Sequence, residues 1–206
     1  MAKKRSYGDR CGIARGLDVV GDRWALLVVR ELLLGPKRFT DLRAGLPRVT
    51  PDVLAQRLRD LEADGVLHHH KLPPPSGARV YELTERGRQL EPVILELGRW
   101  GSAEPFPDGE LGADSFVLAL KTMFDPARRN GDAHVELRIG EDRYDARLDG
   151  DRFDVERGTA GEPQATISGD PGTLAEVTWR GHTFDALEIT GDKRVAKRFL
   201  RAFASA

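Results

Sequence analysis

Residues 50–63 of the chain read TPDVLAQRLRDLEA, and this run combines a helix start signal with apolar and polar residues at helical spacing. Threonine is a preferred cap at helix N-termini, and proline suits the first helical position because its missing N–H is not needed there. Thr50 and Pro51 therefore form a helix start signal. Gly65 lies two positions beyond the run, and glycine commonly ends a helix. The sequence predicts a helix over residues 51–63.

This predicted helix has two chemically different faces. Leu54, Leu58 and Leu61 recur at positions i, i+4 and i+7, so they form an apolar stripe that faces a core. The opposite face carries Gln56 and Arg59, whose side chains can read adenine and guanine edges in the major groove of DNA. An ordinary amphipathic helix with a solvated face is the alternative that this pattern alone leaves open.

The neighbouring segments favour the DNA-reading interpretation. A short helix is expected over residues 39–44, followed by a turn at 45–49, which is the order of a helix-turn-helix. Two strand-like runs, 66–72 and 79–83, then predict a protruding hairpin, or wing. The candidate DNA contacts, as readers or as phosphate-positioning groups, are Lys37, Arg38, Thr40, Arg48, Thr50, Pro51, Asp52, Gln56, Arg59, His69, Lys71 and Arg79.

Helices are also expected on both sides of this core. Ile13, Leu17 and Val20 recur at helical spacing, and residues 24–34 are apolar almost all round, which indicates a buried helix. Thr84 is expected to cap a final helix, in which Pro92 introduces a kink or a delayed start. The apolar face of that helix holds Leu90, Val93, Ile94, Leu97 and Trp100.

Four ordered segments resemble the HxlR-type regulators, within the wider MarR-like group of winged-helix proteins. They are CGIARGLDVVGDRW at 11–24, RELLLGPKRFTDL at 30–42, TPDVLAQRLRDLE at 50–62 and YELTERG at 81–87. The resemblance implies a bacterial homodimer that binds inverted-repeat DNA and regulates transcription. It places dimer contacts on the first and last helices, at Ile13, Leu17, Leu90, Val93, Ile94, Leu97 and Trp100.

Asp52 departs from the pattern of that family. A basic or small polar residue is common at this position, whereas a carboxylate repels phosphate or accepts a hydrogen bond from a cytosine amino group.

The composition bounds the broad class of the protein. The 206 residues are 40% hydrophobic and 32% charged, and the run of apolar residues needed to span a bilayer is missing, as is the apolar core of a secretory signal. A lone cysteine fits a reducing cytoplasm, where the protein is expected. No nucleophile, phosphate-loop or metalloprotease motif is present, so we expect neither an enzyme nor a bound cofactor.

The chain changes character near residues 101–109, which read GSAEPFPDG and predict a boundary between domains 1–104 and 105–206. The first of these holds 18 Lys and Arg against 14 Asp and Glu, and the second holds 14 against 19. A basic first half and an acidic second half suggest that the first half meets a polyanion. We therefore expect a mainly α, winged helix-turn-helix domain followed by an α+β domain.

The second half mixes helix and strand patterns. Helices are expected at 115–124, 171–177 and 192–203, and strands at 135–139, 143–148, 152–156 and 165–168.

The end of the second half resembles sterol-carrier-protein-like domains, through ATISGDPGTLAE at 165–176 and ALEITGDKRVAKRFLRAF at 186–203. That resemblance implies a curved sheet and helices around an apolar cavity, and hence a sensor for a hydrophobic small molecule. The candidate lining residues are Phe116, Leu120, Phe124, Trp179 and Phe184. Ordinary core packing is the alternative for each of them.

Cys11 and the histidines of the predicted wing are two further candidate sites. Cys11 starts the first helix near Arg5, Arg10 and Arg15, a setting that favours thiolate and makes a redox or electrophile sensor an alternative mechanism. An inert packed thiol is its competing interpretation. His68 and His70 lie on one side of a predicted strand, but the sequence places no carboxylate or cysteine near them, so no metal site is expected.

Three functions therefore remain at this point. They are a regulator switched by an apolar ligand, a regulator switched through Cys11, and a small-molecule carrier whose helical half only dimerises.

Overall fold

The computed structural model describes residues 6–102, 109, 111–128 and 130–204. The chain divides into two compact units, Met1–Ile94 and Leu95–Ala206. This division falls inside a helix, whereas the boundary expected at residues 104 and 105 lies outside the described residues. In the described part of the chain, no helix combines the length and the apolar character needed to cross a membrane.

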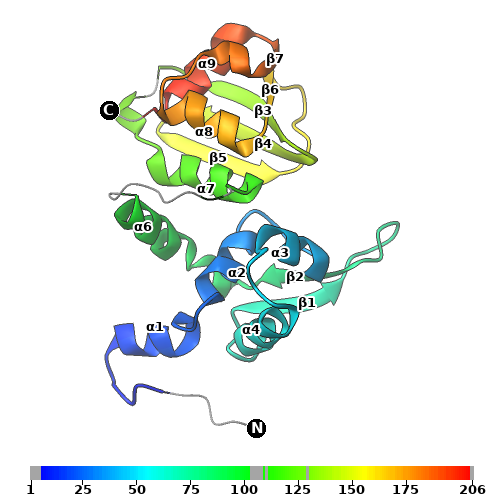
Figure 1. Cartoon of the computed structure of the whole chain (residues 1–206), viewed down its shortest axis with the longest axis vertical. Coiled ribbons are helices and arrows are strands. Elements are labelled where there is room, and N and C mark those ends of the chain that lie inside the picture. The colour runs from blue at the N-terminus through cyan, green and yellow to red at the C-terminus, as the bar shows by residue number, and fades with distance from the viewer. Residues whose placement is uncertain (1–5, 103–108, 110, 129, 205–206) are drawn as a thin grey trace. The chain divides into compact units, whose positions relative to one another are not determined.

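The first unit is mostly helical and carries one antiparallel hairpin (Figure 1). Its elements are α1 (Gly12–Val20), α2 (Ala25–Leu32), α3 (Phe39–Gly45), α4 (Pro51–Ala63), β1 (Leu67–Lys71), β2 (Arg79–Leu83) and α5 (Glu85–Arg88), followed by α6 (Glu91–Gly101), which continues into the second unit.

Helix α4 confirms the prediction for residues 51–63. Thr50 occupies the N-cap position, although its hydroxyl makes no capping hydrogen bond, and Pro51 lies in the first turn, where its missing N–H is tolerated. Leu54, Leu58 and Leu61 are fully buried in a core that α2, α3 and the two strands also supply. This packing fixes which face of α4 remains outside.

The wing hairpin follows α4 directly. Its strands pair in antiparallel register from Leu67 opposite Leu83 to Lys71 opposite Arg79, and the connecting loop projects away from the helices (Figure 1). The predicted run 79–83 is confirmed as β2, and the run 66–72 shortens by one residue at each end. Val66 is itself buried, so it closes the core where α4 gives way to the wing.

The helix expected over residues 24–34 is shorter than predicted. It spans Ala25–Leu32, because Trp24 adopts a left-handed backbone conformation with φ of 78° and ends the preceding turn instead. Burial is also incomplete, since Leu27 remains exposed on its outer side.

The single helix expected after Thr84 is two helices. Thr84 caps the short α5 by accepting a hydrogen bond from the Gly87 N–H. Pro92 has no N–H to continue that helix and its ring would collide with the carbonyl four residues earlier, so it instead occupies the first turn of α6.

Among the described residues, the second unit has a five-stranded mixed sheet and, besides the end of α6, three α-helices, which confirms the predicted α+β layout. Besides the end of α6 its elements are α7 (Ala113–Met123), η1 (Pro126–Arg128), β3 (Ala133–Ile139), β4 (Asp142–Asp149), β5 (Arg152–Arg157), β6 (Ala165–Gly169), α8 (Pro171–Trp179), η2 (Phe184–Ala186), β7 (Glu188–Gly191) and α9 (Lys193–Arg201).

The strand order in this sheet is β5-β4-β3-β6-β7. The β3–β6 pair is parallel and the other neighbours are antiparallel. Four strands were predicted, but β7 was missed, because it is an edge strand whose four residues are mostly exposed and show no apolar alternation.

Aromatic packing fills much of the interior of the second unit. Figure 1 shows α7, α8 and α9 in front of the sheet, and α9 contacts β3, β6 and β7. Phe153 of β5 packs against Phe199 and Phe203, with ring centroids 5.9 and 4.7 Å away, and Phe124 joins them at 5.9 Å from Phe153. The cluster anchors α9 to the sheet by apolar burial.

Candidate nucleic-acid interface

The exposed face of α4 presents the two predicted reading residues together. The Arg59 guanidinium donates to Gln56 Oε1 at 2.7 Å, and Gln56 Nε2 donates to Asp60 Oδ1 at 2.8 Å. Gln56 and Arg59 are exposed, so water or a base edge can replace these bonds at low cost. The side chains are thereby oriented while their donors stay accessible.

The N-terminal end of α4 combines attraction and repulsion for an anion. Thr50, Pro51 and Asp52 are all exposed there, and the Thr50 hydroxyl makes no capping hydrogen bond. Helix N-termini attract phosphate through their free N–H groups and dipole. The carboxylate of Asp52 opposes that attraction, which favours a donor such as a cytosine amino group near it.

Exposed basic groups also lie around α3. Arg38 and Arg48 are exposed at the start of α3 and in the turn before α4, and Thr40 lies exposed between them. The Arg38 N–H donates to Asp41 Oδ2 at 3.0 Å, which fixes the first turn of α3. Their positions suit phosphate contacts that orient a duplex on α4.

Lys37 differs from the other predicted contacts because it is buried. Its side chain is only 10% exposed, and its Nζ lies 2.6 Å from Glu31 Oε2. Its backbone N–H and C=O both bond to Tyr81 of β2, at 3.0 and 2.8 Å. Lys37 thus joins the helix-turn-helix to the wing, and its ammonium is not exposed for a phosphate contact.

Glu31 is a buried acid that holds Arg30 and Lys37 in place, and the sequence analysis missed it. It is 2% exposed and accepts from Arg30 and Lys37 through its two carboxylate oxygens, at 2.7 and 2.6 Å. Gly45 ends α3 so close to it that a Cβ there would lie 2.1 Å from Glu31 Oε2. A lone acid inside the apolar run of α2 was the available signal, because buried carboxylates need partners.

The wing carries a pair of like charges at its outer end. Lys71 and Arg79 are Cα partners across the hairpin, and both are exposed. Like charges directly opposite one another destabilise a hairpin, and a polyanion would relieve that repulsion. His69 is less available, because its Nδ1 lies 2.6 Å from Glu62 Oε1 and so links the wing to α4.

The other two wing histidines have a neighbour that was not expected. Glu82 is the Cα partner of His68, and its carboxylate lies near the rings of both His68 and His70. The expectation that no carboxylate lies beside these histidines is therefore wrong. The reason is strand register, which pairs residues 14 positions apart and leaves no local trace in the sequence.

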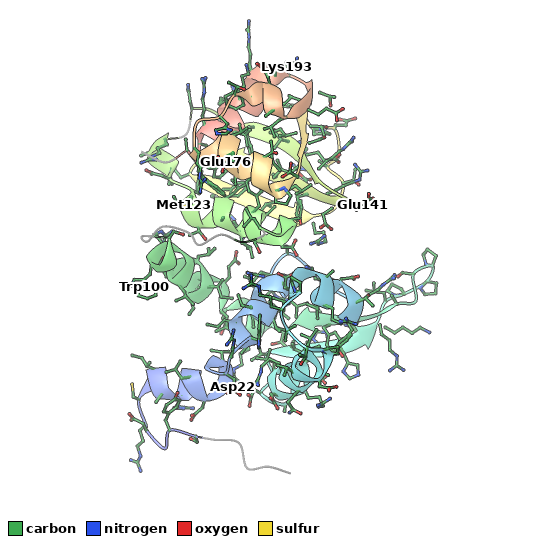
Figure 2. All side chains as sticks on the ribbon, in the orientation of Figure 1. Asp22, Trp100, Met123, Glu141, Glu176 and Lys193 are labelled. Atoms are coloured by element: carbon green, nitrogen blue, oxygen red, sulfur yellow. The ribbon has the colours of Figure 1, made fainter. Side chains whose placement is uncertain are left out.

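The predicted dimerisation residues fall into two classes. Ile13 and Leu17 on α1, and Val93, Leu97 and Trp100 on α6, are exposed, with Ile13 and Trp100 (labelled in Figure 2) reaching 75% and 78%. Leu90 and Ile94 instead pack against the core of the first unit. Helices α1 and α6 each expose apolar side chains, the feature on which the expected dimer contacts depend.

The five predicted ligand-lining residues occupy different surroundings. Phe116 and Trp179 pack together, with ring centroids 5.3 Å apart, and Leu120 is fully buried. Phe124 belongs to the cluster of phenylalanines, whereas Phe184 lies beneath the cations of Lys197 and Arg201. The Trp179 Nε1–H is buried and has no hydrogen-bond acceptor among the described residues.

A buried polar cluster also lies in the second unit. The Tyr144 hydroxyl donates to Asp114 Oδ1 at 2.6 Å, and Arg157 pairs with both Asp114 and Asp142. Burial and the neighbouring Asp114 carboxylate raise the pKa of Tyr144 far above its ordinary value. Tyr144 is therefore a fixed hydrogen-bond donor, and the cluster links α7 to β4 and β5.

Cys11 is exposed at the N-cap of α1. The backbone N–H groups of Ala14 and Ile13 stabilise its thiolate and hold the pKa of Cys11 below its ordinary value. Arg5, expected nearby, lies outside the described residues.

Comparison with known proteins assigns the first half of the chain to a protein family. The family model for HxlR-like helix-turn-helix proteins matches residues 19–106. The uncharacterized HTH-type transcriptional regulator YybR of Bacillus subtilis (strain 168) is 38% identical over 106 residues, covering 49% of this chain and 82% of the relative.

Two solved structures are also similar to this half. The redox regulator HypR in its oxidized form is 36% identical, covering 47% of this chain and 100% of HypR with a TM-score of 0.42. Quinone-bound YodB from B. subtilis is 28% identical, covering 45% and 97% with a TM-score of 0.39.

Proposed function

We propose how this protein recognises DNA, from the premise that this chain belongs to the HxlR family of helix-turn-helix transcriptional regulators. The protein binds inverted-repeat operator DNA as a homodimer and inserts α4 into the major groove. The observation that carries the proposal is the exposed Gln56–Arg59 pair on α4, whose opposite face is buried in the core. Gln56 reads adenine and Arg59 reads guanine.

The positioning contacts come from groups on either side of α4. Arg38, Thr40 and Arg48 bind phosphates next to α3, while Lys71 and Arg79 bind them from the wing. The wing contacts are sequence-independent, so they add affinity and salt dependence without adding specificity.

A binding assay with the full chain tests this function. We expect it to prefer a duplex from upstream of its own coding sequence over a scrambled duplex by a factor of about 10³ or more at moderate salt. Equal affinity for the two duplexes would contradict the proposal and favour a carrier whose helical half only dimerises.

Redox switching through Cys11 is the second candidate, favoured by the exposure of this thiol and its lowered pKa. The thiolate attacks a peroxide oxygen, giving a sulfenic acid on the protein and releasing hydroxide. HypR, similar to this chain, is a redox regulator. We expect peroxide to change the operator affinity of the wild type and to leave Cys11→Ser unchanged, and an equal response in both would remove this candidate.

The second unit is proposed to sense an apolar small molecule. Support comes from the Phe116–Trp179 pair and from the buried Trp179 N–H, which an acceptor atom on a ligand would satisfy. The test is a titration with a fluorescent long-chain fatty acid analogue. We expect saturable binding that Trp179→Phe weakens and Trp100→Phe leaves unchanged, and no saturable binding would count against the sensor.

A further inference from the structure

The wing holds a cluster of three potential metal ligands that DNA reading does not use. His68 and His70 are two positions apart on β1, so they lie on the same face of the hairpin, and Glu82 is the residue directly opposite His68 on β2. One ligand atom from each of these three residues lies within 4.8 Å of the other two.

The spacing of these atoms is too long for hydrogen bonding between the side chains. Glu82 Oε2 lies 3.8 Å from His68 Nε2 and 3.5 Å from His70 Nε2, beyond the 2.7–3.2 Å typical of an N–H···O bond. The nearby His69 and Glu62 are an internal contrast, because their atoms approach to 2.6 Å as an ordinary pair. Ligand atoms bound to one tetrahedral Zn²⁺ at about 2.0–2.1 Å lie roughly 3.3 Å apart.

The two imidazole rings are already arranged for joint binding. Their centroids are 5.1 Å apart and their planes differ by 24°, so the rings stack with both Nε2 atoms near the same carboxylate. His70 Nδ1 is buried and has no hydrogen-bond partner in the described part of the chain, which leaves Nε2 as the accessible ligand atom of that ring.

We propose that His68, His70 and Glu82 form a divalent transition-metal site on the wing, for which Zn²⁺ is the reference ion. Imidazole nitrogen and carboxylate oxygen are ligands that Zn²⁺ accepts, and three protein ligands leave a fourth position for water. Bound Zn²⁺ holds β1 and β2 together at a point where side-chain hydrogen bonds do not.

Metal binding also changes the charge of the DNA-facing hairpin. The ion adds two positive charges beside Lys71 and Arg79 and offsets the carboxylate of Glu82. We therefore expect Zn²⁺ to increase operator affinity, mainly through phosphate attraction. This consequence rests on the proposed function, whereas metal binding itself does not.

Isothermal titration of the tag-free full chain with Zn²⁺ tests the site. We expect one ion per chain, and at least about tenfold weaker binding in His68→Ala, His70→Ala and Glu82→Gln. His69→Ala is the matched control, because it removes a histidine from the other face of the same strand. Circular dichroism checks that each variant is folded. No uptake by the wild type, or equal uptake by all variants, would overturn the site.

Operator affinity is then measured with Zn²⁺ and with a chelator, for the wild type and Glu82→Gln. A gain in the wild type alone supports the coupling. Zn²⁺ uptake through the three ligands with unchanged operator affinity would overturn the coupling and leave the site standing. Uptake without any operator preference would contradict the proposed DNA-binding function instead.

Discussion

At the scale of single residues, the fate of a charged side chain depends on what lies within a few ångströms of it. Lys37 and Arg38 are adjacent and have similar chemistry, yet Lys37 is buried against Glu31 while Arg38 is exposed. A buried charge needs a partner, and Glu31 supplies it. Basic residues near α4 are therefore not equivalent candidates for phosphate contacts.

Arg59→Ala tests the reading role of that residue. If Arg59 contacts a guanine edge, its loss should cost about 1–3 kcal/mol on the preferred operator and relax discrimination at one base position. Affinity is measured on a panel of duplexes with single-base substitutions.

Arg152→Ala is the control for Arg59→Ala. Arg152 is an exposed arginine of the second unit, and its Nη2 lies 3.6 Å from Oδ1 of the exposed Asp154. A uniform loss of affinity on every duplex of the panel would make Arg59 a phosphate contact and leave base reading to Gln56.

At the scale of secondary-structure elements, capping decides several boundaries. Asp170 caps α8 and accepts from both the N–H and the hydroxyl of Thr173, at 2.9 and 2.5 Å. These bonds from Thr173 hold the pKa of Asp170 below its ordinary value. The charged cap therefore contributes to the stability of the second unit.

This capping predicts a pH-dependent effect of Asp170→Ala. The folded pKa is lower than the unfolded value of about 3.9, so the contribution is fully present above that value and is lost as the pH falls through the folded pKa. We expect Asp170→Ala to cost about 0.5–2 kcal/mol at neutral pH and progressively less at acidic pH.

Urea unfolding of the wild type, Asp170→Ala and Asp170→Ser across this range provides the measurement. Serine also caps helices but carries no charge, so the serine variant should retain most of the stability at neutral pH. A destabilisation by Asp170→Ala that stays constant with pH would rule out a role for the ionised carboxylate.

At the scale of the whole molecule, exposed apolar faces bear on the proposed pairing of two chains. Helix α1 exposes Ile13 and Leu17, and α6 exposes Val93, Leu97 and Trp100. Apolar residues that are exposed singly are normal, whereas a contiguous exposed apolar patch favours a protein interface. A homodimer that covers these faces agrees with the proposed binding to inverted repeats.

Trp100→Ala should weaken this dimer. Tryptophan is enriched among the interface residues whose loss costs about 2 kcal/mol or more, which corresponds to about a thirtyfold rise in the dimer dissociation constant. Sedimentation velocity at decreasing protein concentration measures the change. Leu27→Ala is the control, since Leu27 is exposed on α2, outside the two apolar faces. A dimer that dissociates no more readily than the wild type would exclude α6 from the interface.

The sequence alone was enough for features that depend on local pattern. Thr50–Pro51 marked the start of α4, the spacing of Leu54, Leu58 and Leu61 marked its buried face, and the strands of the wing followed from their composition. These signals are local because capping and helical periodicity involve residues a few positions apart. The opposite face, with Gln56 and Arg59, followed from the same geometry.

Only the tertiary structure decided features that join distant parts of the chain. It buried Lys37 on Glu31, placed β3 parallel to β6, and brought Glu82 across from His68 and His70. Register and packing set these contacts, and a shift of one residue would reverse which side chains meet. The predicted reading helix was therefore visible in the sequence, whereas the candidate metal site on the wing was not.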